Sequence, residues 1–566
     1  MTDQSRSRQR FFDSLGQRLQ QMPPEQLRAS VLRYAQGLYS PQRDRFLTSL
    51  IVDDETERVH DPTDLTWPIE SDPLLTEIDN FVARLESADY VDDGDWGDDP
   101  YDDWSEGHDS WVWEFNGFFT QADEAFLAGR LGLARAAYQR LFDALSRTED
   151  IETSWGYEPA VAMLDTDLAE AQARYLRAVY ETTSATERAP VLAESWFGLP
   201  DEDAEVSLAT VREARRRDLP EFGQFLSAWV STLRSLEYSS PPVRQLLTEA
   251  TLLFDGVDGL GDLARETRHD QAEHYLQWVQ ALRRERRESE AIDAANEALS
   301  VLGEGPVKAL IAEELADLVY DDAAQVVAAR RNAWRAAPNQ SRLLALHEAS
   351  THTSEATEVM AAELKVLESA DRFDGGLHAA LAILAGRVDD IVQVLEQNQP
   401  QRSARDVLVP YLLASGCSGP QHPAWSSTRL AQFITTVDRQ ALWDGFATFG
   451  LVTGTPDHTP PLSELFIRQI QQQRVTNDVL SKRLTAAIVA IEHEVDSIVS
   501  NKQRRQYASA AQLLVCCAEA FMLANHTVQG RDFIRNWKTR YPRHIAFQRE
   551  FDGAIEKASL LNSATA

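Results

Sequence analysis

Residues 118–145 combine two apolar helical faces with one glycine between them, and this pattern constrains the fold more than any other in the chain. Small residues let two antiparallel helices approach closely, while an aromatic ring fills the groove to the next pair. The pattern therefore predicts a helical hairpin with its turn at Gly129. The residues at helical spacing are Phe118, Ala122 and Ala125 before the turn, and Ala134, Tyr138 and Leu141 after it.

Three other segments carry partial versions of this pattern, which resembles that of tetratricopeptide repeats without its leading Trp-x-x-Leu-Gly. Glycine (26) and proline (23) make 49 of 566 residues, about 9%, below the roughly 12% of average usage. Several degenerate hairpins at irregular intervals predict an all-α chain, organised as an α-solenoid. The segments are residues 274–299 (Tyr275, Leu282, Ala291, Ala295, Ala298), 326–346 (Ala333, Pro338) and 375–396 (Gly386).

Charge and breaker residues predict how the chain is divided. The start is mildly basic and helical in pattern, whereas residues 51–110 hold 21 acidic residues against Arg58 and Arg84. Two stretches rich in Gly, Pro, Ser and Gln interrupt the later apolar pattern. The predicted parts are an N-terminal helical head (1–60), an acidic aromatic linker or loop (61–110), a helical-hairpin repeat region (111–397), a linker (398–425) and a C-terminal helical block (426–566).

The acidic stretch is the first candidate binding element. Residues 89–109 hold ten acids, no lysine or arginine, and four aromatic residues. One interpretation is a solvated loop whose aromatics pack locally. Another is docking onto a basic partner surface or imitation of a phosphate chain, and a third is an intramolecular clamp with the basic C-terminal block. The candidate docking residues are Asp92, Asp93, Asp95, Trp96, Asp98, Asp99, Tyr101, Asp102, Asp103 and Trp104.

Calcium binding by the same stretch is a weaker alternative. Asp93, Asp95 and Asp98 match part of an EF-hand loop. However, Asp98 and Trp104 stand where that loop requires glycine and glutamate. We therefore predict no metal site there.

Residues 501–550 reverse the sign of the charge, with nine Lys/Arg against three acids. Together with Trp537 and Tyr541, these cations could contact nucleic acid by phosphate pairing and base stacking. The alternative is a solvated helix face, which the net charge of −34 favours because it repels a polyanion. The candidate anion-binding residues are Arg531, Arg535, Lys538, Arg540 and Arg543.

No motif predicts catalysis. Cys417 and Ser418 share a glycine-flanked loop with His422, but spacing alone shows no base within hydrogen-bond reach. Cys516 and Cys517 are adjacent on an apolar helix, so their side chains point about 100° apart and are expected to be buried. The glycines of residues 256–262 lack the Lys-Ser/Thr of a nucleotide loop. We expect no catalytic residue, no metal and no cofactor.

The hydropathy pattern predicts a soluble cytoplasmic protein. Three cysteines cannot form a disulfide framework, and no run of 18 apolar residues occurs. The most apolar stretch, residues 508–524, is interrupted by Gln512 and Glu519, which is typical of a buried helix. The first residues, MTDQSRSRQRFF, form no apolar signal segment.

Two C-terminal segments, NKQRRQYASAAQLLVCCAEAF and DFIRNWKTRYPRHIAFQREFDGA, carry a family resemblance. They are similar to the closing helices of tetratricopeptide-like regions attached to bacterial SWIM zinc-finger proteins. The segments AARRNAWRAAPNQSRLLAL and WEFNGFFTQADEAFLAGRL resemble earlier parts of those regions. The resemblance covers residues 111–550. The Cys-x-Cys and Cys-x-His zinc motif is absent, so the metal and nucleic-acid role that the family implies does not carry over.

These observations predict a non-enzymatic scaffold or adaptor that binds one or more proteins in a bacterial multi-protein assembly. We expect it not to bind a membrane. The mechanism would be shape and charge complementarity between stacked helix pairs and partners with a basic surface. The alternative is a nucleic-acid-linked regulator, which binds through residues 502–549 or mimics DNA through residues 89–109. A hydrolase with Cys417 or Ser418 as nucleophile is a third hypothesis.

Overall fold

The computed structural model is helical throughout the part of the chain that it describes, which confirms the all-α prediction. It divides into two compact units, Met1–Gly259 and Leu260–Ala566. The boundary lies inside the predicted repeat region and within one helix, α11 (Pro241–Glu266). The described residues are 71–86, 110–148, 163–200, 206–236, 241–267, 272–351, 355–369, 374–392, 395, 402–438 and 460–563. The predicted head at residues 1–60 lies outside them.

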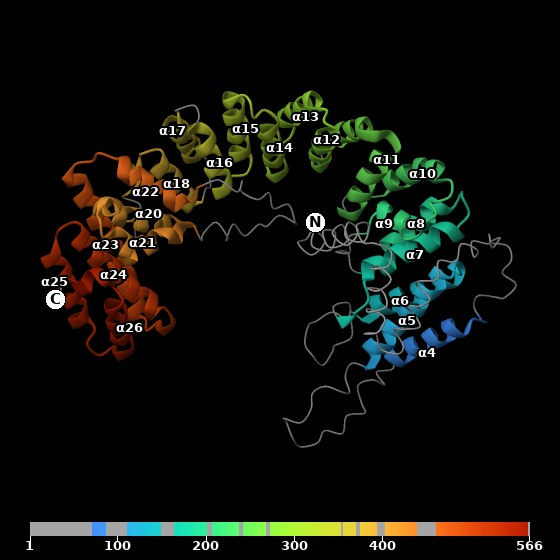
Figure 1. Ribbon diagram of the computed structural model, residues 1–566, viewed down its shortest axis with the longest axis horizontal. Coiled ribbons are helices and arrows are strands. Elements are labelled where there is room, and N and C mark those ends of the chain that lie inside the picture. The colour runs from blue at the N-terminus through green and yellow to red at the C-terminus, as the bar shows by residue number, and fades with distance from the viewer. Residues whose placement is uncertain are drawn as a thin grey trace, which may run out of the picture. The chain divides into compact units, whose positions relative to one another are not determined.

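In the first unit, the helices before α11 pack mainly on the helices one or two places along the chain. The predicted hairpin is present as α5 and α6, and Gly129 forms its turn with a φ of +77° (Figure 1). All six residues predicted to line it are buried. The helices are α4 (Pro73–Glu86), α5 (Ser110–Leu127), α6 (Leu131–Thr148), α7 (Leu168–Thr182), α8 (Arg188–Phe197), α9 (Leu208–Glu213) and α10 (Phe222–Ser235), followed by α11.

Helix α4 corrects the prediction of a linker at residues 61–110. Its Phe81 is fully buried, and the ring lies 5.3 Å from Phe115 and 5.2 Å from Phe118 of α5. Leu75 and Ile78 supply the rest of a buried face at helical spacing. The regional excess of acids hid this apolar stripe, and Glu77 and Asp79 lie exposed between its buried positions.

The second unit begins with a regular succession of antiparallel helices in which α12 to α18 each contact the next one (Figure 1). The later helices gather into a cluster. The helices are α12 (Glu273–Arg284), α13 (Glu288–Val301), α14 (Pro306–Leu318), α15 (Ala323–Ala336), α16 (Gln340–Thr351), α17 (Ala356–Glu368), α18 (Gly375–Leu384), α19 (Val388–Ile391), α20 (Arg402–Gly416), α21 (Arg429–Ile434), α22 (Leu462–Gln472), α23 (Asn477–Ser500), α24 (Tyr507–Leu523), α25 (Thr527–Arg540), α26 (Ile545–Glu556) and α27 (Ser559–Ser563).

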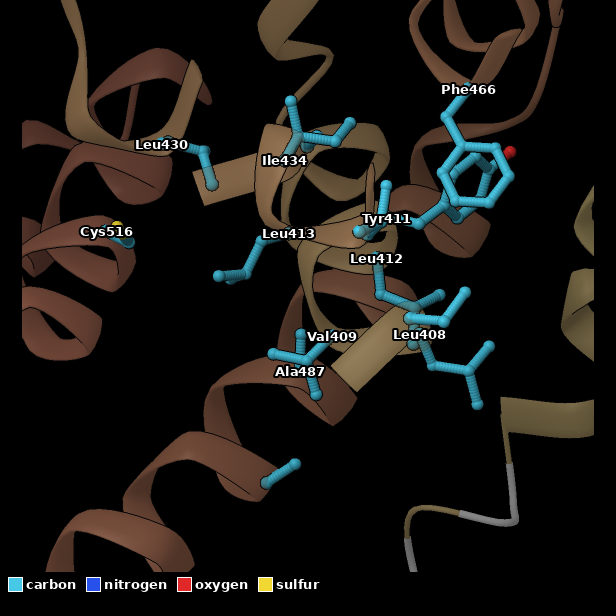
Figure 2. Packing of buried hydrophobic residues seen from close by; sticks show 14 of the residues in the cluster. Leu408, Val409, Tyr411, Leu412, Leu413, Leu430, Ile434, Phe466, Ala487 and Cys516 are labelled. Carbon is cyan, nitrogen blue, oxygen red and sulfur yellow. The ribbon is translucent and has the colours of Figure 1, made fainter. Parts of the chain in front are cut away.

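Helix α20 lies at the centre of this cluster, so the prediction of a linker at residues 398–425 is wrong for residues 402–416. Figure 2 shows its side chains meeting residues of α21, α22, α23 and α24, and one apolar core runs from Val327 to Leu561. Pro410 sits inside the helix and is buried with it. The backbone hydrogen bond lost at Pro410 is offset by the apolar surface that the helix buries on several sides.

Helix α24 is the buried helix predicted at residues 508–524. With the turn before it, Arg504–Leu523 is the one described helix long and apolar enough to cross a membrane. However, 67% of its apolar stretch is buried inside the protein, as expected for a core helix.

Candidate binding surfaces

The structure places the predicted anion-binding residues on and just beyond α25, where three of the five are paired with carboxylates. Arg535 contacts Asp532 at 2.8 Å, Lys538 contacts Asp552 at 2.5 Å, and Arg540 contacts Asp496. Within the described residues, Arg531 and Arg543 have no carboxylate partner. The ten acidic and aromatic docking candidates, Asp92 to Trp104, lie outside the described residues.

Two turns from distant parts of the sequence lie side by side at one end of the last helices. The first joins α23 to α24, and the second joins α25 to α26. The Tyr541 hydroxyl lies 3.2 Å from Ser500 Oγ, and the Phe547 ring lies 5.7 Å from Tyr507 and 6.3 Å from Tyr541. These contacts connect the residues that flank the first turn with those that flank the second.

The paired turns gather exposed cations into one patch, here called the basic end surface. Lys502, Arg504 and Arg505 come from the first turn and have no carboxylate partner among the described residues. Arg543 comes from the second turn, next to Arg540, which ends α25 and is paired with Asp496. These three cations belong to the predicted basic block but not to the predicted anion-binding set, because Arg505 and Arg540 are 35 positions apart in the sequence.

Trp537 and Tyr541 are packed within the helix cluster beneath this surface. The Trp537 side chain is 2% exposed, its Nε1 donates to Glu492 at 3.3 Å, and the Arg540 guanidinium lies over its ring at 4.9 Å. The Tyr541 ring stacks on Trp537 at 6.0 Å. Trp537 therefore has no free ring face for the base stacking considered from the sequence.

A second candidate surface is a groove of about 500 Å³ formed by consecutive helices of the second unit. Alanines from α14, α15 and α16 line it, and Tyr320, which follows α14, is 72% exposed at its edge. Asp317 and Arg330 form a 2.8 Å ion pair beside it. The lining residues are Ala316, Asp317, Tyr320, Ala323, Val326, Arg330 and Ala349.

The structure does not assemble the candidate nucleophiles into a reactive group. Cys417 is 3% exposed, its thiol donates to the Ala414 carbonyl at 3.5 Å, and burial raises the pKa of this thiol to about 12. The Nδ1 atom of His422 accepts from the Ala424 amide at 3.2 Å. Burial also raises the pKa values of Cys516 and Cys517. These thiols are therefore protonated at neutral pH and poor nucleophiles.

The structure also shows no phosphate loop and no metal-binding group among the described residues. Residues 256–262 lie inside α11, where Gly256 adopts a φ of +71° and kinks the helix rather than forming a phosphate loop. Within the described residues, no group of three or more His, Cys, Asp or Glu side chains could hold a metal ion. No protein family model matches the sequence, and no curated protein matches it.

Proposed function

We propose that this chain is a non-enzymatic scaffold or adaptor of a bacterial multi-protein assembly, built as an α-solenoid of degenerate tetratricopeptide-like hairpins. The observation that carries the proposal is the groove formed across three consecutive helices, α14, α15 and α16. Helices stacked in sequence order present such grooves at regular intervals, and solenoid proteins use them to bind extended partner segments.

The packing of the helices supports a solenoid. From α12 to α17, each helix contacts the next, and α12 also contacts α14. Small residues lie at the crossings: Ala291, Ala295 and Ala298 of α13 are fully buried. Each hairpin thus buries its apolar face against its neighbours, which is the arrangement expected of repeat proteins.

The chemistry of the groove favours a partner segment with a small apolar side chain. The three alanines of its lining are short and uncharged, so a side chain of the partner can enter beside them without displacing a large residue. Tyr320 offers an exposed ring and a hydroxyl at the edge, a combination common at interface hot spots. The Asp317–Arg330 pair offers polar partners for a peptide backbone.

The test is cross-linking and recovery of partners by the tagged full-length protein from its native lysate, with and without nuclease. Tyr320→Ala removes the exposed ring, and Ala323→Arg fills the groove. Val528→Ala is the matched control, because Val528 is also 72% exposed but lies on α25. We expect both groove variants to lose partners that the control retains.

A chain lacking residues 89–109 tests the acidic stretch in the same experiment. Partners that survive nuclease but are lost with this deletion would be assigned to the acidic stretch. Partners that are retained by every variant but removed by nuclease would contradict the scaffold proposal and favour the nucleic-acid-linked regulator.

A further inference from the structure

We propose that the basic end surface binds an acidic peptide segment of a partner protein. This inference concerns a site apart from the groove of α14, α15 and α16 and rests on separate observations. The surface is made by two turns that the tertiary structure brings together, so it carries more exposed cations than either turn alone.

The cations of this surface are available to a ligand. Lys502, Arg504, Arg505 and Arg543 are exposed and have no carboxylate partner among the described residues. The nearby Asp496 is already neutralised, because it pairs with Arg540 and accepts from the Tyr541 hydroxyl at 2.7 Å. The local field is therefore positive, although the whole chain carries a net charge of −34.

The surface also carries an apolar contact point. Ile545 begins α26 directly after the second turn and is 76% exposed. Removing this apolar side chain from water on binding favours a partner segment that covers it. Cations next to an exposed apolar side chain match a segment in which carboxylates alternate with apolar or aromatic residues.

A peptide fits this surface better than a nucleic acid does. Single-stranded nucleic acids bind where aromatic rings are open for base stacking, whereas Trp537 is 2% exposed and covered by Arg540. Double-stranded DNA carries one charge per about 1.7 Å, so it would be repelled by the acidic remainder of the chain. A short peptide senses chiefly the charges within a Debye length, which is about 8 Å at physiological salt.

The experiment measures fluorescence anisotropy of two labelled probes with the full chain. One probe is a synthetic peptide of about 20 residues in which Asp/Glu alternate with apolar residues, two of them tryptophan. The other is an oligothymidylate of equal net charge. We expect the peptide to bind more tightly, and its affinity to fall several-fold between about 50 and 200 mM salt, because the contact is electrostatic.

Matched double variants locate the site. Arg504→Glu with Arg543→Glu reverses two charges of the basic end surface. Arg474→Glu with Arg402→Glu changes the net charge equally, in the turn before α23 and at the start of α20. We expect the first pair to raise the peptide Kd at least tenfold, roughly, and the second pair about twofold or less. Circular dichroism confirms that both variants remain folded.

Three results would overturn the proposal: equal losses in the two double variants, tighter binding of the oligothymidylate, or no peptide binding at low salt. The groove variants Tyr320→Ala and Ala323→Arg should leave the peptide Kd unchanged. Failure of the scaffold proposal would therefore be seen in the recovery of partners, and failure of this one in the anisotropy.

Discussion

The side chain of Glu519 accepts a hydrogen bond at 3.0 Å from the backbone amide of Leu430, which lies 89 residues earlier in the chain. Glu519 lies in the C-terminal half of the core helix α24, and Leu430 is in the first turn of α21. The carboxylate thus satisfies an amide at a helix start that has no partner within its own helix. Burial nevertheless dominates and raises the pKa of Glu519 to about 7 from the usual 4.5.

Replacing Glu519 by glutamine should remove a pH dependence of stability. The raised pKa means that the folded state holds this proton more tightly, so the free energy of unfolding falls as the pH rises from about 4.5 to about 7 and then levels off. Glutamine keeps an accepting oxygen without a charge. At pH 8 the variant should be more stable by about 2–3 kcal/mol, with little difference at pH 4.5. Thermal unfolding at both pH values checks this, and a pH-independent difference would contradict it.

Removing the two arginines that pair with the buried carboxylate of Glu363 should destabilise the protein more than removing the carboxylate itself. It is fully buried and paired with Arg335 at 2.7 Å and Arg331 at 3.0 Å, whereas the two arginines are 43% and 32% exposed. Converting both arginines to methionine leaves a buried charge unpaired, which costs about 3–5 kcal/mol. Glu363→Met leaves cations that water can solvate and should cost about 1–2 kcal/mol. Denaturant unfolding of the two variants gives the comparison, and the reverse order would refute it.

All three cysteines should be unreactive in the native protein. Cys417, Cys516 and Cys517 are at most 3% exposed, and burial raises the pKa of each thiol. We expect native labelling by a maleimide at pH 7 to be about 100-fold slower than labelling in denaturant, which should reach all three. Rapid stoichiometric modification of native Cys417 would revive the hydrolase hypothesis.

Gly416 should not tolerate a side chain, because α20 and α23 approach closely there. A Cβ at Gly416 would lie 2.6 Å from the backbone nitrogen of Leu484. Gly416→Ala should therefore destabilise the protein by about 1–3 kcal/mol. Gly117→Ala is the control, since it meets nothing within 4 Å in helix α5 and should stabilise by up to about 1 kcal/mol. Similar melting temperatures for the two variants would contradict the close approach.

The helices that sequence analysis predicted well are those whose pattern is local. The Gly129 and Gly386 turns both adopt positive φ, at +77° and +70°, between apolar faces of helical period. The missed helices were hidden by their surroundings. Helix α4 lies in an acidic region, and α20 contains Pro410 and is flanked by breaker residues.

The amino-acid sequence by itself determined the helical class, the hairpin turns, the buried character of α24 and the burial of the cysteines, because spacing and hydrophobicity act over one or two helical turns. Only the tertiary structure decided that α20 is central, that Trp537 is covered, and that Arg504 and Arg543 share one surface. These results depend on contacts between residues tens of positions apart. Such contacts follow from how whole helices pack, and no local period in the sequence encodes them.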